Sequence, residues 1–291
     1  MDAENPLVTI ALAVKNNART IRDALRSCFE QTYEPKEVIA ADGLSTDGTL
    51  EELKRWPLRL LLSDEGRGLA YARQLLLEHA RGEYILWVDG DHVLPPDFLE
   101  KQVAYLKKHP NVGAVEGITY PYDGGLVAFV EGITWTVSAF RRARLGPTLP
   151  SAGTAATLYR RKAAVEAGGF DFLFKIAAED AMITRAMRER GWYFAVNPDA
   201  WVYHAARSSW KGLWKEYFWW GYGAFLVRKK YPSTVRPWRF YPPMALASGI
   251  VNALRAAKYT GSAASLAIPI HYLYKRTAWT YGYLKAKGSL G

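Results

Sequence analysis

Short apolar runs alternate with stretches of helical periodicity along the first part of the chain. The run VTIALAV at 8–14 lies between Pro6 and a polar stretch, as expected for a strand buried on both faces. Strands are also predicted at 37–41, 59–62 and 84–88, and helices at 18–31, 52–56 and 69–81. This alternation predicts an α/β fold in which helices wrap a mostly parallel sheet.

The alternation extends to about residue 204. Helices are predicted at 99–108, 126–144, 161–167 and 177–191, and strands at 112–116, 156–160 and 194–203. Three apolar stretches follow, at 213–227, 242–257 and 261–274. We therefore expect an α/β domain over 1–204 and a helical region over 205–291.

Charge separates the same two regions. The formal net charge is +10, but residues 205–291 hold 14 Lys and Arg against one acidic residue, Glu216, which gives them +13. They also hold six of the 11 Trp and nine of the 18 Tyr. Basic and aromatic side chains beside apolar stretches are typical of membrane interfaces. We expect this region to contact a membrane through short spans or interfacial helices; a basic helical hairpin packed on the α/β domain is the alternative.

Composition also limits the cellular compartment and the classes of partner that we expect. The single cysteine, Cys28, excludes an intrachain disulfide and a cysteine-rich metal site. The N-terminus lacks the pattern of a secretory signal, so we expect this part of the chain to stay on the cytoplasmic side of the cell membrane. The basic, aromatic tail could also indicate nucleic-acid binding. The apolar residues 242–274 argue against that class, and we expect no nucleic-acid partner.

Polar side chains follow the predicted strands. Asn16 lies shortly after the first strand, Asp42 comes directly after the second, and the sequence DGD at 89–91 follows the strand at 84–88. The carboxyl ends of parallel strands meet at one edge of a sheet, where ligands of such folds bind. We therefore expect these side chains to share a ligand site.

The carboxylates at this edge suggest two kinds of chemistry. Asp89 and Asp91 could ligate a hard divalent cation, Mg²⁺ or Mn²⁺, which commonly bridges a protein to a diphosphate. An ordinary Asp-Gly turn is the alternative; an aspartyl nucleophile fits poorly because no Thr follows. Asp42 could accept hydrogen bonds from the N–H of a base, or simply stabilise a turn.

Two further acidic residues and a histidine are candidates. Glu179 and Asp180 begin a predicted helix, where the helix dipole favours negative charge. They could form an ordinary charged first turn or provide a general base toward an acceptor hydroxyl. His204 ends an aromatic strand and could be a third metal ligand or a buried histidine with satisfied hydrogen bonds.

Taken in order, these motifs resemble those of the family two glycosyltransferases, which have the GT-A fold and bind nucleotide sugars. Residues 8–49 resemble the family's opening strand, helix and D-G-S-T-D-G-T turn. Residues 65–92 resemble its G-x-x-x-A-R-N helix and D-x-D strand, and GGFD followed by AAEDAMI at 177–183 resembles its last two elements. The resemblance covers roughly residues 7–204.

The resemblance implies a donor site. Asp42 would bind the nucleotide base, and Asn16 would line the same pocket. Arg67 or Arg73 could approach the phosphates, although Gln74 replaces the usual Asn of the motif.

It also implies a metal site and a catalytic pair. Asp89 and Asp91 would hold Mn²⁺ or Mg²⁺ on the diphosphate, and His204 would complete the metal shell. Asp180 would be the catalytic base of an inverting reaction, with Glu179 as its neighbour. If the acceptor were a phosphate, which is already ionised, Asp180 would position the sugar or the acceptor instead.

The substrates are inferred from one departure and from the tail. The processive synthases of the family carry Q-x-x-R-W, whereas this chain has EYFWW at 216–220, so we expect transfer of one sugar per encounter. The tail is similar to the appendages of dolichyl-phosphate mannosyltransferases and cellulose-synthase-like enzymes. This favours GDP-mannose as donor and a dolichyl or polyprenyl phosphate as acceptor. A UDP-sugar-dependent transferase acting on another glycan or glycolipid, and a non-catalytic membrane or nucleic-acid-binding protein on the same fold, are the alternatives.

Overall fold

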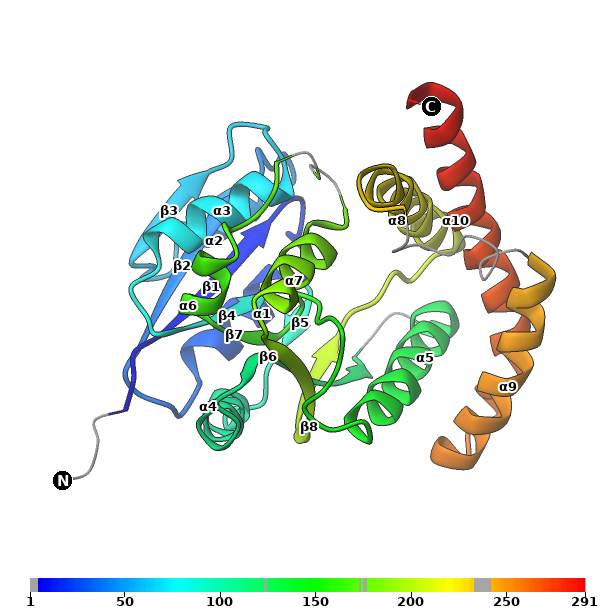
Figure 1. Cartoon of the computed structure of the whole chain (residues 1–291), viewed down its shortest axis with the longest axis horizontal. Helices are drawn as coiled ribbons and strands as arrows, with labels where there is room; N and C mark the ends of the chain where they lie inside the picture. Colours follow the sequence, from blue (N-terminus) through cyan, green and yellow to red (C-terminus); the bar gives the residue numbers. More distant parts are fainter. Residues whose placement is uncertain (1–4, 123–124, 173, 175–176, 233–241, 291) are drawn as a thin grey trace. The chain divides into compact units, whose positions relative to one another are not determined.

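The computed structural model describes residues 5–122, 125–172, 174, 177–232 and 242–290 of the chain (Figure 1). The chain forms two compact units. The first comprises Met1–Ile118, Ala139–Lys175 and Glu179–Tyr203, and the second comprises Thr119–Ser138, Ile176–Ala178 and His204–Gly291. The assignment of 1–204 to catalysis and of 205–291 to membrane association is a functional one and stays a prediction.

The first unit is built on an eight-stranded sheet with the strand order β3-β2-β1-β4-β7-β6-β8-β5. The strands are β1 (Val8–Val14), β2 (Lys36–Asp42), β3 (Leu60–Ser63), β4 (Tyr84–Val88), β5 (His92–Val93), β6 (Val112–Pro121), β7 (Thr157–Arg160) and β8 (Tyr193–His204). β1 pairs in parallel with β2 and β4, and β2 pairs in parallel with β3, as the alternation predicted. β7 runs antiparallel to both β4 and β6, so the sheet is mixed beyond β4.

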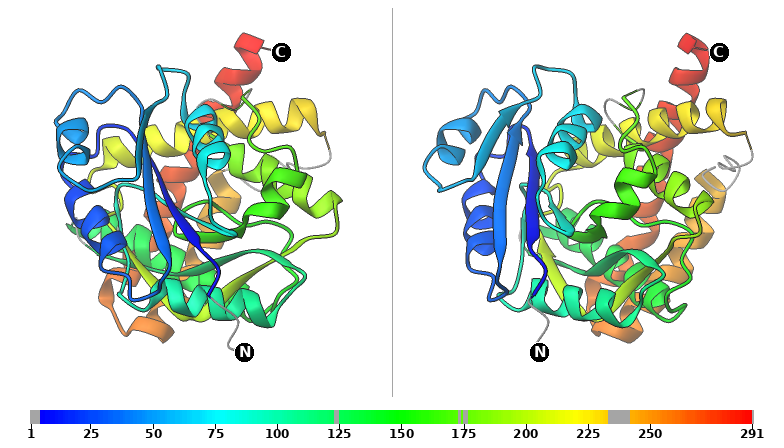
Figure 2. Two further views of the ribbon diagram at one scale, coloured as in Figure 1. Left: turned by 90° about the vertical axis from the view of Figure 1, so that its left-hand side faces the viewer. Right: turned by 60° about the vertical axis from the view of Figure 1, so that its left-hand side comes forward.

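Helices cover both faces of this sheet. They are α1 (Ile21–Phe29), α2 (Thr49–Leu53), α3 (Leu69–His79), α4 (Phe98–Lys108), α6 (Arg161–Glu166) and α7 (Glu179–Glu189). Figure 2 shows α1 and α3 on opposite sides of β1 and β2. All five side chains of β4 are buried, as are six of the seven of β1. This rigid, apolar centre fixes where the polar residues after each strand emerge.

The second unit consists of α8 (Trp210–Lys230), α9 (Pro242–Thr260), a short 3₁₀ helix η2 (Ala263–Ala267), α10 (Ile268–Leu290) and most of α5 (Gly125–Ala143). The three apolar stretches of the tail are therefore helical, as predicted. Helices α8 and α10 cross closely, because Gly221 lies against the backbone of Trp279 and Gly282 against that of Phe218. No helix in the described part of the chain combines the length and the apolar character needed to cross a membrane.

A buried charged cluster joins three helices of this unit. Glu131 of α5 accepts hydrogen bonds from Lys275 Nζ of α10 (2.7 Å) and from the Tyr217 hydroxyl of α8 (2.5 Å). Lys275 also donates to Thr134 Oγ1 (3.2 Å). Because both charges of the Glu131–Lys275 pair are almost fully buried, loss of either partner would leave the other uncompensated.

Candidate active site

The carboxyl ends of β1, β2, β3 and β4 bring polar residues to one edge of the sheet. Asp42 ends β2, Asp64 follows β3, Asp89 follows β4, and Asn16 lies two residues beyond β1. This is the juxtaposition expected from the parallel order of these strands.

Asp42 is buried, and its two carboxylate oxygens differ in their hydrogen bonding. Its Oδ2 accepts a hydrogen bond from the backbone N–H of Ser45 (2.9 Å). Its Oδ1 is buried and has no hydrogen-bond partner among the described residues. Because a buried acceptor without a donor is unfavourable, this oxygen is suited to accept a hydrogen bond from an incoming N–H group.

Asn16 is exposed and makes two hydrogen bonds with the turn after β2. Its backbone N–H donates to Ser45 Oγ (2.9 Å), and its Oδ1 accepts from the backbone N–H of Thr46 (2.9 Å). Asn16 has a positive φ of 54°, a conformation that Asn adopts more readily than most residues. The two contacts fasten the turn after β2 to the end of β1.

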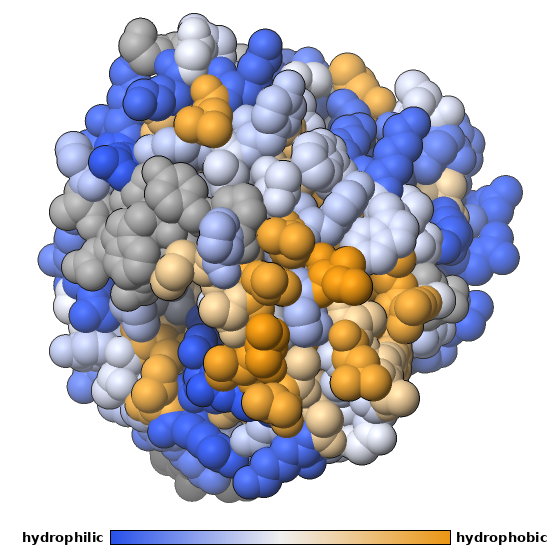
Figure 3. All heavy atoms as spheres, turned by 90° about the vertical axis from the view of Figure 1, so that its right-hand side faces the viewer, coloured by the Kyte–Doolittle hydropathy of each residue, from blue (hydrophilic) through white to orange (hydrophobic). Residues whose placement is uncertain are grey.

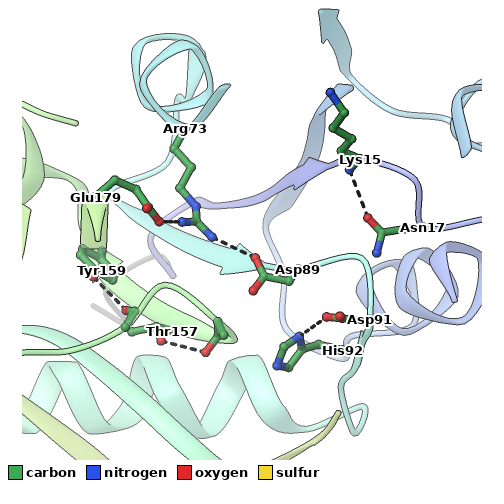
Figure 4. Close-up of polar contacts among 11 residues, drawn as sticks. Lys15, Asn17, Arg73, Asp89, Asp91, His92, Thr157, Tyr159 and Glu179 are labelled. Atoms are coloured by element: carbon green, nitrogen blue, oxygen red, sulfur yellow. Dashed lines mark hydrogen bonds and ion pairs between the residues drawn. The ribbon is translucent and has the colours of Figure 1, made fainter. Parts of the chain in front are cut away.

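The glycine of the DGD sequence is required by close packing. A Cβ on Gly90 would lie 2.8 Å from Cγ of Asn17, and the Gly90 carbonyl accepts a hydrogen bond from Thr20 Oγ1 (2.6 Å). The turn is thereby pressed against the segment that leads into α1. Figure 4 shows that Asp89 and Asp91, the two aspartates of this turn, contact different partners: Asp89 contacts Arg73, and Asp91 contacts His92.

Arg73 of α3 lies between two carboxylates. Its guanidinium donates to Asp89 Oδ1 (3.0 Å) and to Glu179 Oε1, which belongs to the first residue of α7 (Figure 4). The Arg73 side chain is 5% exposed and that of Glu179 4%, whereas that of Asp89 is 33% exposed. Arg73 therefore connects the turn after β4 to the acidic pair and compensates part of the charge at this edge.

The acidic pair has a perturbed titration. Burial raises the pKa of Glu179 to about 7, against the lowering effect of Arg73, and Glu179 Oε2 has no hydrogen-bond partner among the described residues. Burial also raises the pKa of Asp180, whose Oδ1 accepts from the backbone N–H of Ala181 (2.7 Å). A carboxylate with a raised pKa is a stronger base, so Glu179 is suited to accept a proton near neutral pH, and Asp180 is a stronger base than an ordinary aspartate.

Asp91 and His92 are the candidate metal ligands within the first unit. Both are buried, and Asp91 Oδ1 lies 3.1 Å from His92 Nδ1. His204 ends β8 and belongs to the second unit, where its buried ring stacks on Trp135 at a centroid distance of 4.7 Å. The carboxylate oxygen of Asp91 and the imidazole nitrogen of His92 are ligand types suited to a first-row divalent ion such as Mn²⁺.

The two candidate arginines differ in what they contact. Arg67 is exposed, and its guanidinium lies 3.5 Å from the centroid of the Tyr71 ring on α3 and 5.7 Å from that of Phe172. Arg73 is buried and donates to the two carboxylates described above. Of the two, only Arg73 is engaged by the carboxylates of this edge.

Sequence reasoning missed Asp64. Both of its carboxylate oxygens accept backbone hydrogen bonds in the loop before α3, from Gly66 (2.8 Å) and Gly68 (3.2 Å). Its own N–H donates to the carbonyl of Asp42 (3.1 Å). A signal was present, because Asp64 follows a predicted strand much as Asp42 does.

Two other supporting residues were also missed. Gln74 Oε1 accepts from the backbone N–H of Phe170 (2.9 Å), which ties α3 to the GGFD sequence. Glu116 pairs with Arg142 and accepts from the backbone N–H of Gly153 (2.6 Å). A Cβ on Gly153 would lie 3.8 Å from Asp180 Oδ2, so Glu116 anchors the loop beside Asp180.

The order of strands and carboxylates has counterparts in a known family. Residues 9–167, more than half of the chain, match the model of the family described as Glycosyl transferase family 2. The chain belongs to this family. The family 2 match covers β1 to α6 and includes Asp42, Asp89 and Asp91, but stops before Glu179.

Two curated relatives illustrate the extent of similarity. The chain is 32% identical to the putative glycosyltransferase EpsE of Bacillus subtilis over 154 residues, which is 51% of each protein. It is 24% identical to the poly-beta-1,6-N-acetyl-D-glucosamine synthase of Staphylococcus aureus over 242 residues, 80% of this chain and 58% of that protein. The chain thus spans between half and three fifths of the length of these relatives.

Solved structures show the fold. The mannosyltransferase PcManGT from Pyrobaculum calidifontis, in complex with GDP-Man and Mn²⁺, aligns with a TM-score of 0.70 at 23% identity, over 98% of this chain and 88% of that one. S. aureus TarS 1-349 in complex with UDP aligns with a TM-score of 0.54 at 18% identity, over 97% and 90%. The mixed sheet flanked by helices in this family 2 chain is consistent with the GT-A fold.

Proposed function

We propose that the protein is a metal-dependent, inverting glycosyltransferase that moves one sugar from a nucleotide sugar to a lipid-linked acceptor. The observation that carries this proposal is the set of carboxylates at the carboxyl edge of the sheet, in a chain of glycosyl transferase family 2. One carboxylate oxygen of Asp42 has no hydrogen-bond partner among the described residues, and Asp89 and Asp91 flank one turn. Glu179 and Asp180 form an acidic pair in which both pKa values are raised.

The donor would be held from two sides. The spare oxygen of Asp42 would accept an N–H of the nucleotide base, and the turn fastened by Asn16 would line the same pocket. Arg67, which is not engaged by the carboxylates of the edge, is the arginine better suited to meet a phosphate. Arg73 would act as a positioning residue, because its guanidinium is engaged by Asp89 and Glu179.

Asp91 and His92 of the first unit fit a divalent cation by their donor chemistry, with Asp89 on the same turn as Asp91. His204 as a further ligand stays a prediction. The ion, Mn²⁺ or Mg²⁺, would supply charge neutralisation for the departing diphosphate. Because Asp89 is held by Arg73, we assign direct ligation to Asp91, whose carboxylate lies beside the imidazole of His92.

Asp180 of the acidic pair would act on the acceptor. Asp180 would remove the proton of an acceptor hydroxyl as its oxygen attacks the anomeric carbon opposite the leaving group, which inverts the configuration. Glu179 would remain paired with Arg73 and hold α7 in place. Toward an ionised phosphate acceptor, Asp180 would orient the sugar or the acceptor.

GDP-mannose is the favoured donor and a dolichyl or polyprenyl phosphate the favoured acceptor. The basic, aromatic C-terminal segment supports a lipid acceptor and an enzyme at the cell membrane with its catalytic domain on the cytoplasmic side. The structural relative with a TM-score of 0.70 holds GDP-Man and Mn²⁺, which supports this donor.

A UDP-sugar donor is the second candidate. The relative that favours it is TarS, which was solved in complex with UDP and with UDP-GlcNAc. This version of the enzyme would act on another glycan or glycolipid acceptor.

Nucleotide binding to Asp42→Asn tests the donor site. The substitution keeps an oxygen for the Ser45 N–H but replaces the other acceptor oxygen with a donor. We expect GDP or UDP to raise the melting temperature of the wild type and of Asp23→Asn, a control on α1 whose side chain is partly exposed, but not of Asp42→Asn. An equal shift in all three would argue against Asp42 as the base-binding residue.

A further inference from the structure

Helix α9 packs against the second unit through its smallest side chains. Ala245, Gly249 and Ala256 are buried, and Asn252 and Ala253 are half-buried. With about 3.6 residues per turn, these five positions fall within roughly one third of the helix circumference. The inward face of α9 is thus a stripe of small residues with one amide.

The large apolar side chains of α9 point outward instead. Met244 is 47% exposed, Leu246 40%, Ile250 50%, Val251 46% and Leu254 71%. A helix on the surface of a water-soluble protein shows the reverse pattern, with large apolar residues inside and polar residues outside. Figure 3 shows a contiguous hydrophobic patch on the side of the molecule where α9 and α10 lie in Figure 1.

The small stripe allows close helix packing. A Cβ on Gly249 would lie 2.7 Å from the Cα of Pro269 and 3.1 Å from the Cβ of Tyr272, both in α10. The crossing of α8 and α10 uses Gly221 and Gly282 in the same way. Small residues between helices, with large aliphatic residues outside, are the arrangement of helices in contact with lipid.

The patch continues beyond α9 and has a basic end. Leu266 of η2 is 80% exposed, and Ile270 of α10 is 68% exposed. Residues 242–254 carry no charge, whereas Arg255 and Lys258 are exposed on the last turns of α9. An apolar face that ends in basic side chains matches the acyl-to-headgroup boundary of an anionic bilayer.

We propose that the outer face of α9, together with Leu266 and Ile270, is the surface by which this protein docks on a lipid bilayer. The apolar side chains enter the acyl boundary, and Arg255 and Lys258 meet anionic headgroups. The inference rests on the proposed function in one respect, since it names the membrane contact that a lipid-linked acceptor requires. The charge of +13 over residues 205–291 favours a bilayer over a second copy of the chain, which would carry the same charge.

The test compares two double variants of the full chain. Ile250→Ser/Leu254→Ser changes the proposed face, and Leu145→Ser/Val165→Ser removes two exposed apolar side chains of the first unit as a control. Flotation with phosphatidylcholine vesicles, with or without phosphatidylglycerol, measures binding. We expect the first variant to bind both kinds of vesicle roughly tenfold or more weakly than the wild type, and the control to bind normally.

A third variant, Arg255→Gln/Lys258→Gln, should lose affinity for the anionic vesicles only. Wild-type protein that does not float, or equal flotation of all apolar variants, would overturn the proposal. So would a change from dimer to monomer in the Ile250→Ser/Leu254→Ser variant without a change in flotation, because the face would then join two copies.

Nucleoside diphosphate release from a water-soluble donor is measured in parallel. It should be unchanged in the Ile250→Ser/Leu254→Ser variant, because neither side chain belongs to the carboxylate edge. Normal flotation without any release would count against the proposed function alone, whereas normal release with unaltered flotation of the variant would count against the docking face alone.

Discussion

Removal of Arg73 should destabilise the first unit strongly, because its guanidinium compensates two carboxylates. In Arg73→Met the Glu179 side chain, 4% exposed, would lose its ionic partner, and its Oε2 already has no hydrogen-bond partner among the described residues. Breaking a buried ion pair by removing one partner costs about 3–5 kcal/mol. Asp89 adds little to this cost, since a third of its side chain is exposed and solvent screens it.

The loss of unfolding free energy in Arg73→Met should increase as the pH rises. Arg73 lowers the pKa of Glu179, which burial raises to about 7, so removal of the arginine would raise that pKa further. At a pH below the pKa of Glu179 in the variant, the carboxyl is protonated, and burying it without a partner costs little. At a pH above that pKa, an unpaired negative charge is buried. We therefore expect a larger loss of unfolding free energy at a mildly alkaline pH than at a mildly acidic one.

Urea unfolding followed by tryptophan fluorescence, in EDTA at both pH values, measures this. The double variant Arg73→Met/Glu179→Gln, which removes both charges, should regain most of the stability. A loss below about 1 kcal/mol on the alkaline side, or a double variant no more stable than the single one, would refute the view that the pair is a buried, mutually dependent contact.

Asp91→Ala should abolish sugar transfer while leaving the melting temperature close to that of the wild type, and metal-dependent transfer by this variant would contradict the assignment of the DGD turn. Because the pKa of Glu179 is raised from 4.5 to about 7, its stabilising contribution is complete below pH 4.5 and is lost as the pH rises through 7. Unfolding midpoints of Glu179→Gln should therefore fall less over this range than those of the wild type, and parallel curves would argue against a buried titrating Glu179. Lys275→Met should cost about 3–5 kcal/mol in urea unfolding, with partial recovery in Lys275→Met/Glu131→Gln; additive losses would show that the two charges do not depend on each other.

Local pattern was enough to predict the strands that position the donor edge. β1 and β4 were located to the residue because their apolar runs are bounded by polar or turn residues on both sides. The position of Asp42 and Asp89 at one edge then follows from the parallel order of the strands. Family membership was reached by the order of the motifs and is confirmed by the match over 9–167.

Other features depend on contacts that no local pattern records. Arg73 was expected near phosphates, but its partner Glu179 lies 106 residues away, and only the tertiary packing of the first unit brings them together. The direction of β7 was not predictable from four residues. Helix α9 was expected, but apolar periodicity treats small residues such as Ala245 and large ones such as Leu254 alike, so it could not show that the small side chains face inward.

Donor turnover by the purified chain in detergent would test the proposed sugar transfer directly. A panel of GDP- and UDP-sugars would be offered with Mn²⁺ or Mg²⁺ and dolichyl phosphate, and nucleoside diphosphate release would be followed with and without EDTA. We predict metal-dependent release from one donor, increased by the lipid acceptor and absent in Asp91→Ala. No release from any donor, together with no nucleotide-dependent change in melting temperature, would contradict this prediction.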